Sequence, residues 1–196
     1  MTDVQHFRVK LFATPESRPR LANAVPVFHR WIQEKRLPEM MIDVSDYEHV
    51  PSGPGIILVC HEAIYGLDEG KGRLGLVYNR RSVLDGSVEE RLRQAVRAAE
   101  SAATLLEHEP EFAGKLRFDR TQWEVAVNDR ALAPNTETTW KELEAPIRAV
   151  FDTLIGSGEY QLQYHPDPRE LFRVTVNGAG DGTPVPDLVA GGANRR

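Results

Sequence analysis

The sequence predicts an α+β fold, with a mixed, largely antiparallel sheet and about three helices packed mainly on one face. Short segments with period-two alternation of apolar and polar residues recur along the chain and predict strands. Three longer segments have apolar residues at three- and four-residue spacing, which is typical of amphipathic helices. The elements do not alternate in a regular βαβ order, so a parallel doubly wound fold is excluded. We expect one domain over residues 1–177 and a flexible Gly/Pro-rich tail over residues 178–196.

The first strand is predicted at residues 7–12, where Phe7, Val9 and Leu11 alternate with Arg8 and Lys10. A helix follows, because one stripe is apolar and begins after a proline that suits a first helical turn. The residues concerned are Pro26, Val27, Phe28, Trp31 and Ile32. Residues 40–44 then predict a second strand.

A hairpin is predicted from two arms, residues 56–62 and 73–78, joined by the loop of residues 66–72. The first arm is apolar on both faces, which favours a central place in the sheet. The longest helix begins next, because Ser87 and Glu90 have the spacing of a capping box. Its apolar stripe consists of Val88, Leu92, Val96, Ala99, Ala103 and Leu106.

The last third of the chain predicts a strand pair, a helix and two final strands. The pair is expected at residues 116–118 and 123–127, and the helix begins at a second capping-box pattern, Thr139 to Glu142. Pro146 should kink or split this helix, and Gly156 is in the position of a C-cap. The final strands are predicted at residues 160–164 and 171–176. Residues 172–176 resemble residues 7–11, although five residues are too few to establish a repeat.

Composition excludes several classes of function. The formal net charge of -5 argues against binding to nucleic-acid phosphates, which requires clustered Lys and Arg. The single cysteine, Cys60, excludes an intramolecular disulfide and is best interpreted as a small buried hydrophobic residue. We find no secretory signal and no apolar run of the roughly 20 residues that span a bilayer, so no membrane association is expected and a cytoplasmic protein is predicted.

The segment around Asp43 and His49, together with His61 and Glu62, is the strongest candidate for catalysis. If residues 43–49 remain extended, Asp43 and His49 share one face with Ser45 and Tyr47. Two histidines and a carboxylate could hold a divalent metal with an open position for water, so His49, His61 and Asp43 are candidate metal ligands. Caps and turns are the favoured interpretation of the same residues, because no spacing of the HExxH type fixes two ligands on one helical face.

The loop with Asn128, Asp129 and Arg130 is a candidate ligand-binding segment, because it concentrates hydrogen-bonding groups between a strand and a helix. Turns stabilised by Asp or Asn side chains explain this composition as well. Both interpretations stay open at the level of sequence.

Four segments resemble those of a family of bacterial proteins, including cyanobacterial ones, to which we can assign no activity, cofactor or catalytic residue. They are VFHRWIQ, IDVSDYEHVPSGPGIILVCHEAIYGLD, RLGLVYNRR and NDRALAPN, and the resemblance covers most of residues 7–176. It implies a bacterial cytoplasmic origin.

The leading hypothesis for function is a non-catalytic domain that binds a protein partner or forms a homo-oligomer. The alternative is a metal-dependent or acid–base hydrolase that uses Asp43, His49, His61 and Glu62. A third hypothesis, a small-molecule sensor, predicts a cavity without a reactive group.

Overall fold

The protein is described by a computed structural model that covers residues 3–51 and 53–178. In this part of the chain, three helices and eight strands follow one another in the order expected of an α+β fold. The elements are β1 (Phe7–Ala13), α1 (Ala24–Glu34), β2 (Met41–Asp46), β3 (Ile56–Cys60), β4 (Ala63–Asp68), β5 (Gly75–Arg80), α2 (Val88–His108), β6 (Phe118–Val127), α3 (Glu137–Leu154), β7 (Tyr160–Tyr164) and β8 (Arg173–Gly178).

The eight strands form one sheet in the order β2-β3-β4-β5-β1-β6-β8-β7. Every neighbouring pair of strands is antiparallel, which confirms the predicted class and makes the sheet wholly rather than largely antiparallel. The strand β1 is the first in the sequence but lies near the centre of the sheet, where β5 and β6 flank it. The edges are β2 and β7.

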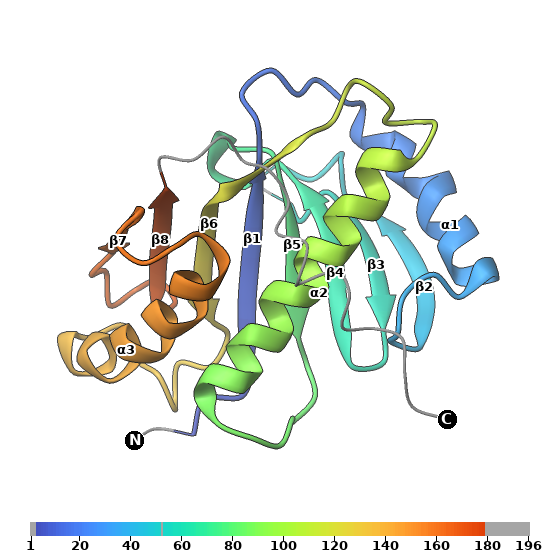
Figure 1. Cartoon of the computed structure of the whole chain (residues 1–196). Helices are drawn as coiled ribbons and strands as arrows, with labels where there is room; N and C mark the ends of the chain where they lie inside the picture. Colours follow the sequence, from blue (N-terminus) through green and yellow to red (C-terminus); the bar gives the residue numbers. More distant parts are fainter. Residues whose placement is uncertain (1–2, 52, 179–196) are drawn as a thin grey trace.

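All three helices pack on one face of the sheet. Figure 1 shows α2 crossing that face, with α3 toward the β7 edge and α1 toward the β2 edge. The alternating side chains Phe7, Val9 and Leu11 of β1 point into the same apolar core as Phe28 and Trp31 of α1. Burial of these large side chains stabilises the fold by roughly 1.5–3 kcal/mol for each one.

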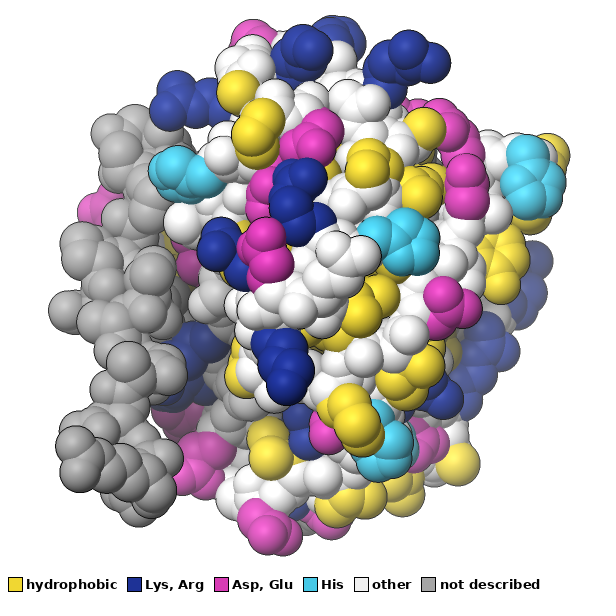
Figure 2. All heavy atoms as spheres, turned by 90° about the vertical axis from the view of Figure 1, so that its right-hand side faces the viewer, with side chains coloured by type: hydrophobic (Ala, Val, Ile, Leu, Met, Phe, Trp, Pro, Cys, Tyr) yellow, Lys and Arg dark blue, Asp and Glu magenta, His cyan; other side chains and the backbone are white. Residues whose placement is uncertain are grey.

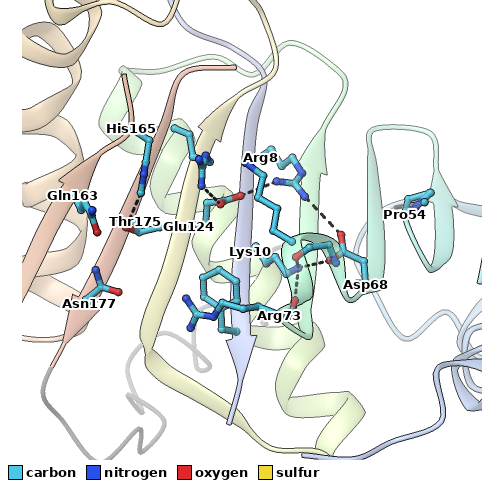
Figure 3. Close-up of a pocket in the computed structure, with 15 residues that line it drawn as sticks. Arg8, Lys10, Pro54, Asp68, Arg73, Glu124, Gln163, His165, Thr175 and Asn177 are labelled. Atoms are coloured by element: carbon cyan, nitrogen blue, oxygen red, sulfur yellow. Dashed lines mark hydrogen bonds and ion pairs between the residues drawn. The ribbon is translucent and has the colours of Figure 1, made fainter. Parts of the chain in front are cut away.

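The other face of the sheet is not covered by these helices, and we call it the open face (Figures 1 and 3). The strand register gives its middle row of side chains, because residues paired across neighbouring strands point to the same face. From β2 to β7 that row reads Ser45, Ile57, Gly66, Val77, Lys10, Glu124, Thr175 and Gln163. In this row, the side chains over β3, β4 and β5 are small or apolar, and those over β1, β6, β8 and β7 are charged or polar.

Two predicted strand assignments are wrong. Residues 63–68 form an additional strand, β4, between the two predicted arms. The single predicted hairpin is therefore two hairpins, β3–β4 and β4–β5, and a tight turn at His61 and Glu62 connects β3 to β4. The strand β3 consequently lies next to the edge rather than at the centre, and its second apolar face, Ile57 and Val59, belongs to the open face. Residues 118–127 form the single strand β6 instead of a pair, because β1 and β8 flank it on both sides.

The predicted start of α3 is also wrong, whereas that of α2 is confirmed. The N-cap of α3 is Thr136, whose hydroxyl accepts a hydrogen bond from the Thr139 N–H. Thr139 and Glu142 therefore lie inside the helix. Pro146 does not split α3, which continues to Leu154, and Gly156 follows with φ at +115° as a helix-ending glycine requires. Of the predicted tail, Gly178 belongs to β8 and residues 179–196 lie outside the described part.

Candidate functional site

The residues of the hypothetical hydrolase site do not converge. Met41 of β2 pairs with Cys60 of β3, and Asp46 pairs with Ile56, so the two strands run in opposite directions along their whole length. His61 follows Cys60 at one end of this pair, whereas His49 lies in a turn after the other end of β2. A six-residue strand spans roughly 20 Å, which separates the two imidazoles by far more than one metal ion can bridge.

Local contacts explain the carboxylates of that hypothesis. Asp43 Oδ1 accepts a hydrogen bond from the adjacent Val44 N–H at 2.8 Å, and Glu62 Oε2 accepts one from the Met40 N–H at 3.2 Å. Only His61 and Glu62 meet, with 3.6 Å between Nδ1 and Oε1, on an exposed turn. Among the described residues, no group of three or more His, Cys, Asp or Glu side chains could hold a metal ion.

The candidate loop at residues 128–130 is a turn stabilised by its own aspartate. Asp129 Oδ1 accepts hydrogen bonds from the N–H groups of Ala131 and Leu132, at 3.0 and 3.1 Å. Arg130 donates to the backbone carbonyl of Arg169, and the Asn128 N–H donates to the carbonyl of His6. The three residues lie outside the cleft described below.

Exposed apolar side chains gather at the β2 edge. Of the six large hydrophobic residues that are exposed in the described part, four fall within eleven consecutive residues: Met40, Ile42, Tyr47 and Val50. We call them the 40–50 surface. Figure 2 faces this side of the molecule and shows apolar side chains interspersed with acidic, histidine and Lys or Arg side chains. Asp43, Asp46 and Glu48 are also exposed here, and residues 40–50 contain no Lys or Arg.

A cleft of about 840 Å³ lies on the polar half of the open face. Figure 3 shows its walls: side chains of β1 and β6 form the floor, β8 and β7 form one side, and Asp68 and Pro54 lie on the other. A volume of this size is within the range of small-molecule sites. A cavity of this kind is what the third hypothesis, a small-molecule sensor, requires.

Glu124 of β6 forms the centre of the ion-pair network on the cleft floor. Its two oxygens contact the guanidinium groups of Arg8 and Arg173, at 3.0 and 3.3 Å. These arginines come from β1 and β8, the two strands that flank β6. Residues 7–11 and 172–176, which resemble each other in sequence, thus lie on opposite sides of β6. The arginine of each segment, Arg8 or Arg173, contacts the Glu124 carboxylate.

Lys10 is the most deeply buried charge of the cleft. Its side chain is 3% exposed, and Nζ contacts the Asp68 carboxylate and the carbonyl oxygens of Arg73, at 2.7 Å, and Gly70, at 3.4 Å. Burial lowers the pKa of the Lys10 ammonium from its ordinary value, and the Asp68 charge opposes that shift. Three acceptors match the three N–H donors of an ammonium, so the donors of Lys10 are already used.

Arg73 differs from Lys10 and Arg173 because its guanidinium retains unused, accessible donors. The guanidinium of Arg73 stacks on the ring of Phe12 at 3.6 Å and forms no ion pair with a carboxylate of the described residues. Arg173 contacts Glu124 and Glu170, but its buried Nε has no hydrogen-bond acceptor. Next to Arg173, whose carbonyl accepts from the His165 N–H, His165 Nε2 lies 3.0 Å from the Thr175 hydroxyl. Burial and the nearby Arg173 lower the pKa of His165, which favours the neutral imidazole.

None of the cleft residues was among the sequence-based candidates. Arg8 and Lys10 were interpreted only as the polar face of an alternating strand, because the pattern does not distinguish a solvated face from a functional one. The one available signal was the similarity of residues 172–176 to residues 7–11, which repeats Arg at the same position of a strand.

Comparisons with known proteins found no counterpart: no family model, no curated protein and no solved structure matches this chain. Within the described residues, no helix has the length and apolar character needed to cross a membrane.

Proposed function

We propose that this chain is a protein-binding domain that contacts its partner through the 40–50 surface. The observation that supports this proposal is the concentration of four of six exposed large hydrophobic residues within eleven positions of one sheet edge. Isolated exposed apolar residues are ordinary, but a concentration of them along one sheet edge is typical of an interaction surface. Met40 and Ile42, at 60% and 56% exposure, are the central contacts.

The partner contacts these side chains rather than extending the sheet. Val44 N–H is already bonded to the Asp43 carboxylate, and the register shifts between Met41 and Asp43. Both features protect an edge strand against pairing with another strand.

The charges of the surface favour one class of partner. Asp43, Asp46 and Glu48 are exposed beside the apolar residues, so two copies of this chain would bring like charges together. A segment of a different protein with alternating apolar and basic side chains complements both properties. We therefore assign the surface to such a segment and not to a homo-oligomer.

The proposal is tested with two synthetic peptides of about ten residues, one alternating leucine with lysine and one alternating leucine with glutamate. Affinity is measured by fluorescence anisotropy at physiological salt, and the contact surface by amide chemical shifts in NMR. We expect the basic peptide to bind and to shift signals of residues 40–50. The Met40→Ser, Ile42→Ser double variant should weaken binding at least about tenfold, since central apolar contacts dominate interface energies.

The matched control is the Val83→Ser, Leu132→Ser double variant, which removes the two exposed hydrophobic residues outside the 40–50 surface. It should bind like the natural chain. Equal losses in both double variants, or shifts confined to other residues, would contradict the proposal. A dimer in analytical ultracentrifugation that Met40→Ser, Ile42→Ser abolishes would also contradict it, by assigning the surface to a second copy.

A further inference from the structure

The cleft on the open face concentrates positive charge in an acidic protein. Five basic side chains line it, Arg8, Lys10, Lys71, Arg73 and Arg173, against the two carboxylates of Asp68 and Glu124. The neighbouring Glu170 contacts Lys71 and Arg173 and reduces the excess to two positive charges. The whole chain has a formal net charge of -5. A basic cleft on such a chain attracts anions selectively, because its local charge is opposite in sign to that of the whole molecule.

The donor group that remains available in this cleft is the guanidinium of Arg73. The guanidinium of Arg73 lies over the Phe12 ring, and its N–H groups can donate two parallel hydrogen bonds to one ligand group. The terminal nitrogens of Arg173 are already paired with Glu124 and Glu170, and its Nε is buried, so Arg173 contributes charge rather than free donors. The paired N–H groups of the Arg73 guanidinium match the geometry of a carboxylate or a phosphate.

Neutral polar groups complete the cleft. Gln163 and Asn177 line it from β7 and β8, beside the His165 and Thr175 pair (Figure 3). Amides, a hydroxyl and a neutral imidazole are groups that recognise hydroxyl and carbonyl substituents of a polar ligand. The cleft therefore combines an anion-binding end with a side that suits the uncharged part of an organic molecule.

We propose that the cleft binds a small organic oxyanion, with a carboxylate or phosphate group held by Arg73 and the remainder against Gln163 and Asn177. This site is independent of the 40–50 surface. A nucleic acid is a poorer fit, since an excess of two positive charges neutralises too few phosphates to hold a polyanion against the repulsion of the whole chain.

Binding is tested by isothermal titration calorimetry with inorganic phosphate, citrate and ribose 5-phosphate, and with ribose as the uncharged comparison. In parallel, the Nε–Hε signals of arginine are followed by NMR. We expect at least one anion to bind and to shift the signal of Arg73, and ribose to have no effect. If none of the three anions shifts this signal at millimolar concentration, the proposal is wrong.

Two cleft variants separate a specific site from general charge attraction. Arg73→Gln removes the guanidinium and should weaken binding at least about tenfold, the effect of losing a charge-assisted hydrogen bond. Gln163→Glu is nearly isosteric at an exposed position, adds one negative charge to the cleft and should also weaken binding. Circular dichroism verifies that each variant is folded.

The controls make the same chemical changes elsewhere: Arg97→Gln on α2 and Gln33→Glu on α1, both at exposed positions. Neither should alter the affinity. Equal weakening by a cleft variant and its control would show an adventitious ion only. Tighter binding of a single-stranded oligonucleotide than of every small anion, with the same Arg73 shift, would overturn the assignment to a small molecule.

Discussion

Cys60 shows how its surroundings determine the chemistry of a single residue. Its side chain is fully buried in β3, and burial, together with the charges of Glu39 and Glu62, raises the pKa of the thiol to about 12. Because the thiolate is the reactive form, this shift suppresses reaction at ordinary pH. The predicted burial of Cys60 is confirmed.

We expect Cys60 to resist alkylation by iodoacetamide at pH 8 in the folded protein. Compared with a thiol of ordinary pKa near 9, a pKa of about 12 leaves about a thousandfold less thiolate, so the folded protein should react at least a hundredfold more slowly than the chain in guanidinium. Intact mass measured over time gives both rates. Similar rates in a sample that retains its circular dichroism spectrum would refute this expectation.

A second residue with a displaced pKa is Glu100 of α2. Its side chain is 1% exposed, Oε1 accepts from Arg120 Nε at 3.0 Å, and Oε2 has no partner. Burial raises the pKa of this carboxyl, although the Arg120 charge opposes the shift. The folded protein therefore retains a proton on Glu100 at pH values where the unfolded chain has lost it.

This difference predicts a pH dependence of stability. A carboxyl whose pKa is raised on folding lowers the free energy of unfolding as pH increases above its ordinary value of 4.5. The Glu100→Gln variant lacks that titration, so its stability relative to the natural chain should increase between pH 4.5 and 7. Urea denaturation at several pH values measures it, with Glu16→Gln at an exposed position as the control. A constant difference across this range would contradict the prediction.

Among the elements, α2 and α3 begin in different ways although similar sequence patterns predicted both starts. Ser87 accepts a hydrogen bond from the Glu90 N–H at 3.2 Å, and Glu90 Oε2 accepts one from the Ser87 N–H at 2.7 Å. This reciprocal pair is a capping box. In α3 the same pattern at Thr139 lies one turn inside the helix, because Thr136 provides the cap first.

We expect Ser87→Ala to lower the free energy of unfolding by about 1 kcal/mol, since the first turn of α2 loses the hydroxyl that accepts its N–H. In a protein of this size, Tm should fall by about 2–4 °C. Differential scanning calorimetry measures both quantities. Ser101→Ala, inside the same helix, serves as the control and should not lower Tm. An equal decrease of Tm in this control would show that loss of the cap is not the cause.

For the whole molecule, the sheet order sets the expected distribution of local stability. The strands β1 and β6 have two neighbours each and lie under the helices, whereas β2 and β7 are edges. Backbone groups of edge strands lack partners on one side and open at low cost.

Hydrogen–deuterium exchange should therefore be slowest in β1 and β6 and at least about a hundredfold faster in the outward-facing amides of β2 and β7. Mass spectrometry of exchanged peptides, or NMR of individual amides, provides the rates. Slower exchange in β2 than in β1 would contradict the sheet order or indicate that the edge is covered in solution. The Met40→Ser, Ile42→Ser variant distinguishes these cases, because it should restore fast exchange only if a second copy covers the edge.

The sequence by itself determined most of the elements and the core. Phe7, Val9, Leu11, Phe28 and Trp31 were assigned to apolar faces from their spacing, and all of them are buried. The start of α2 was predicted equally well, because a cap depends on residues only three positions apart. The strand β4 was missed, since the two-residue turn at His61 has no glycine or asparagine to mark it.

The tertiary structure alone decided which residues form a site. His49 and His61 are twelve positions apart but lie at opposite ends of two strands. Lys10 and Asp68 are 58 positions apart and form a buried pair, and Arg8 reaches Glu124 over 116 positions. Local patterns depend on residues that are near one another in the chain, whereas these pairs depend on strand order and register. Only the folded sheet brings the charges of β1, β4, β6 and β8 into one cleft.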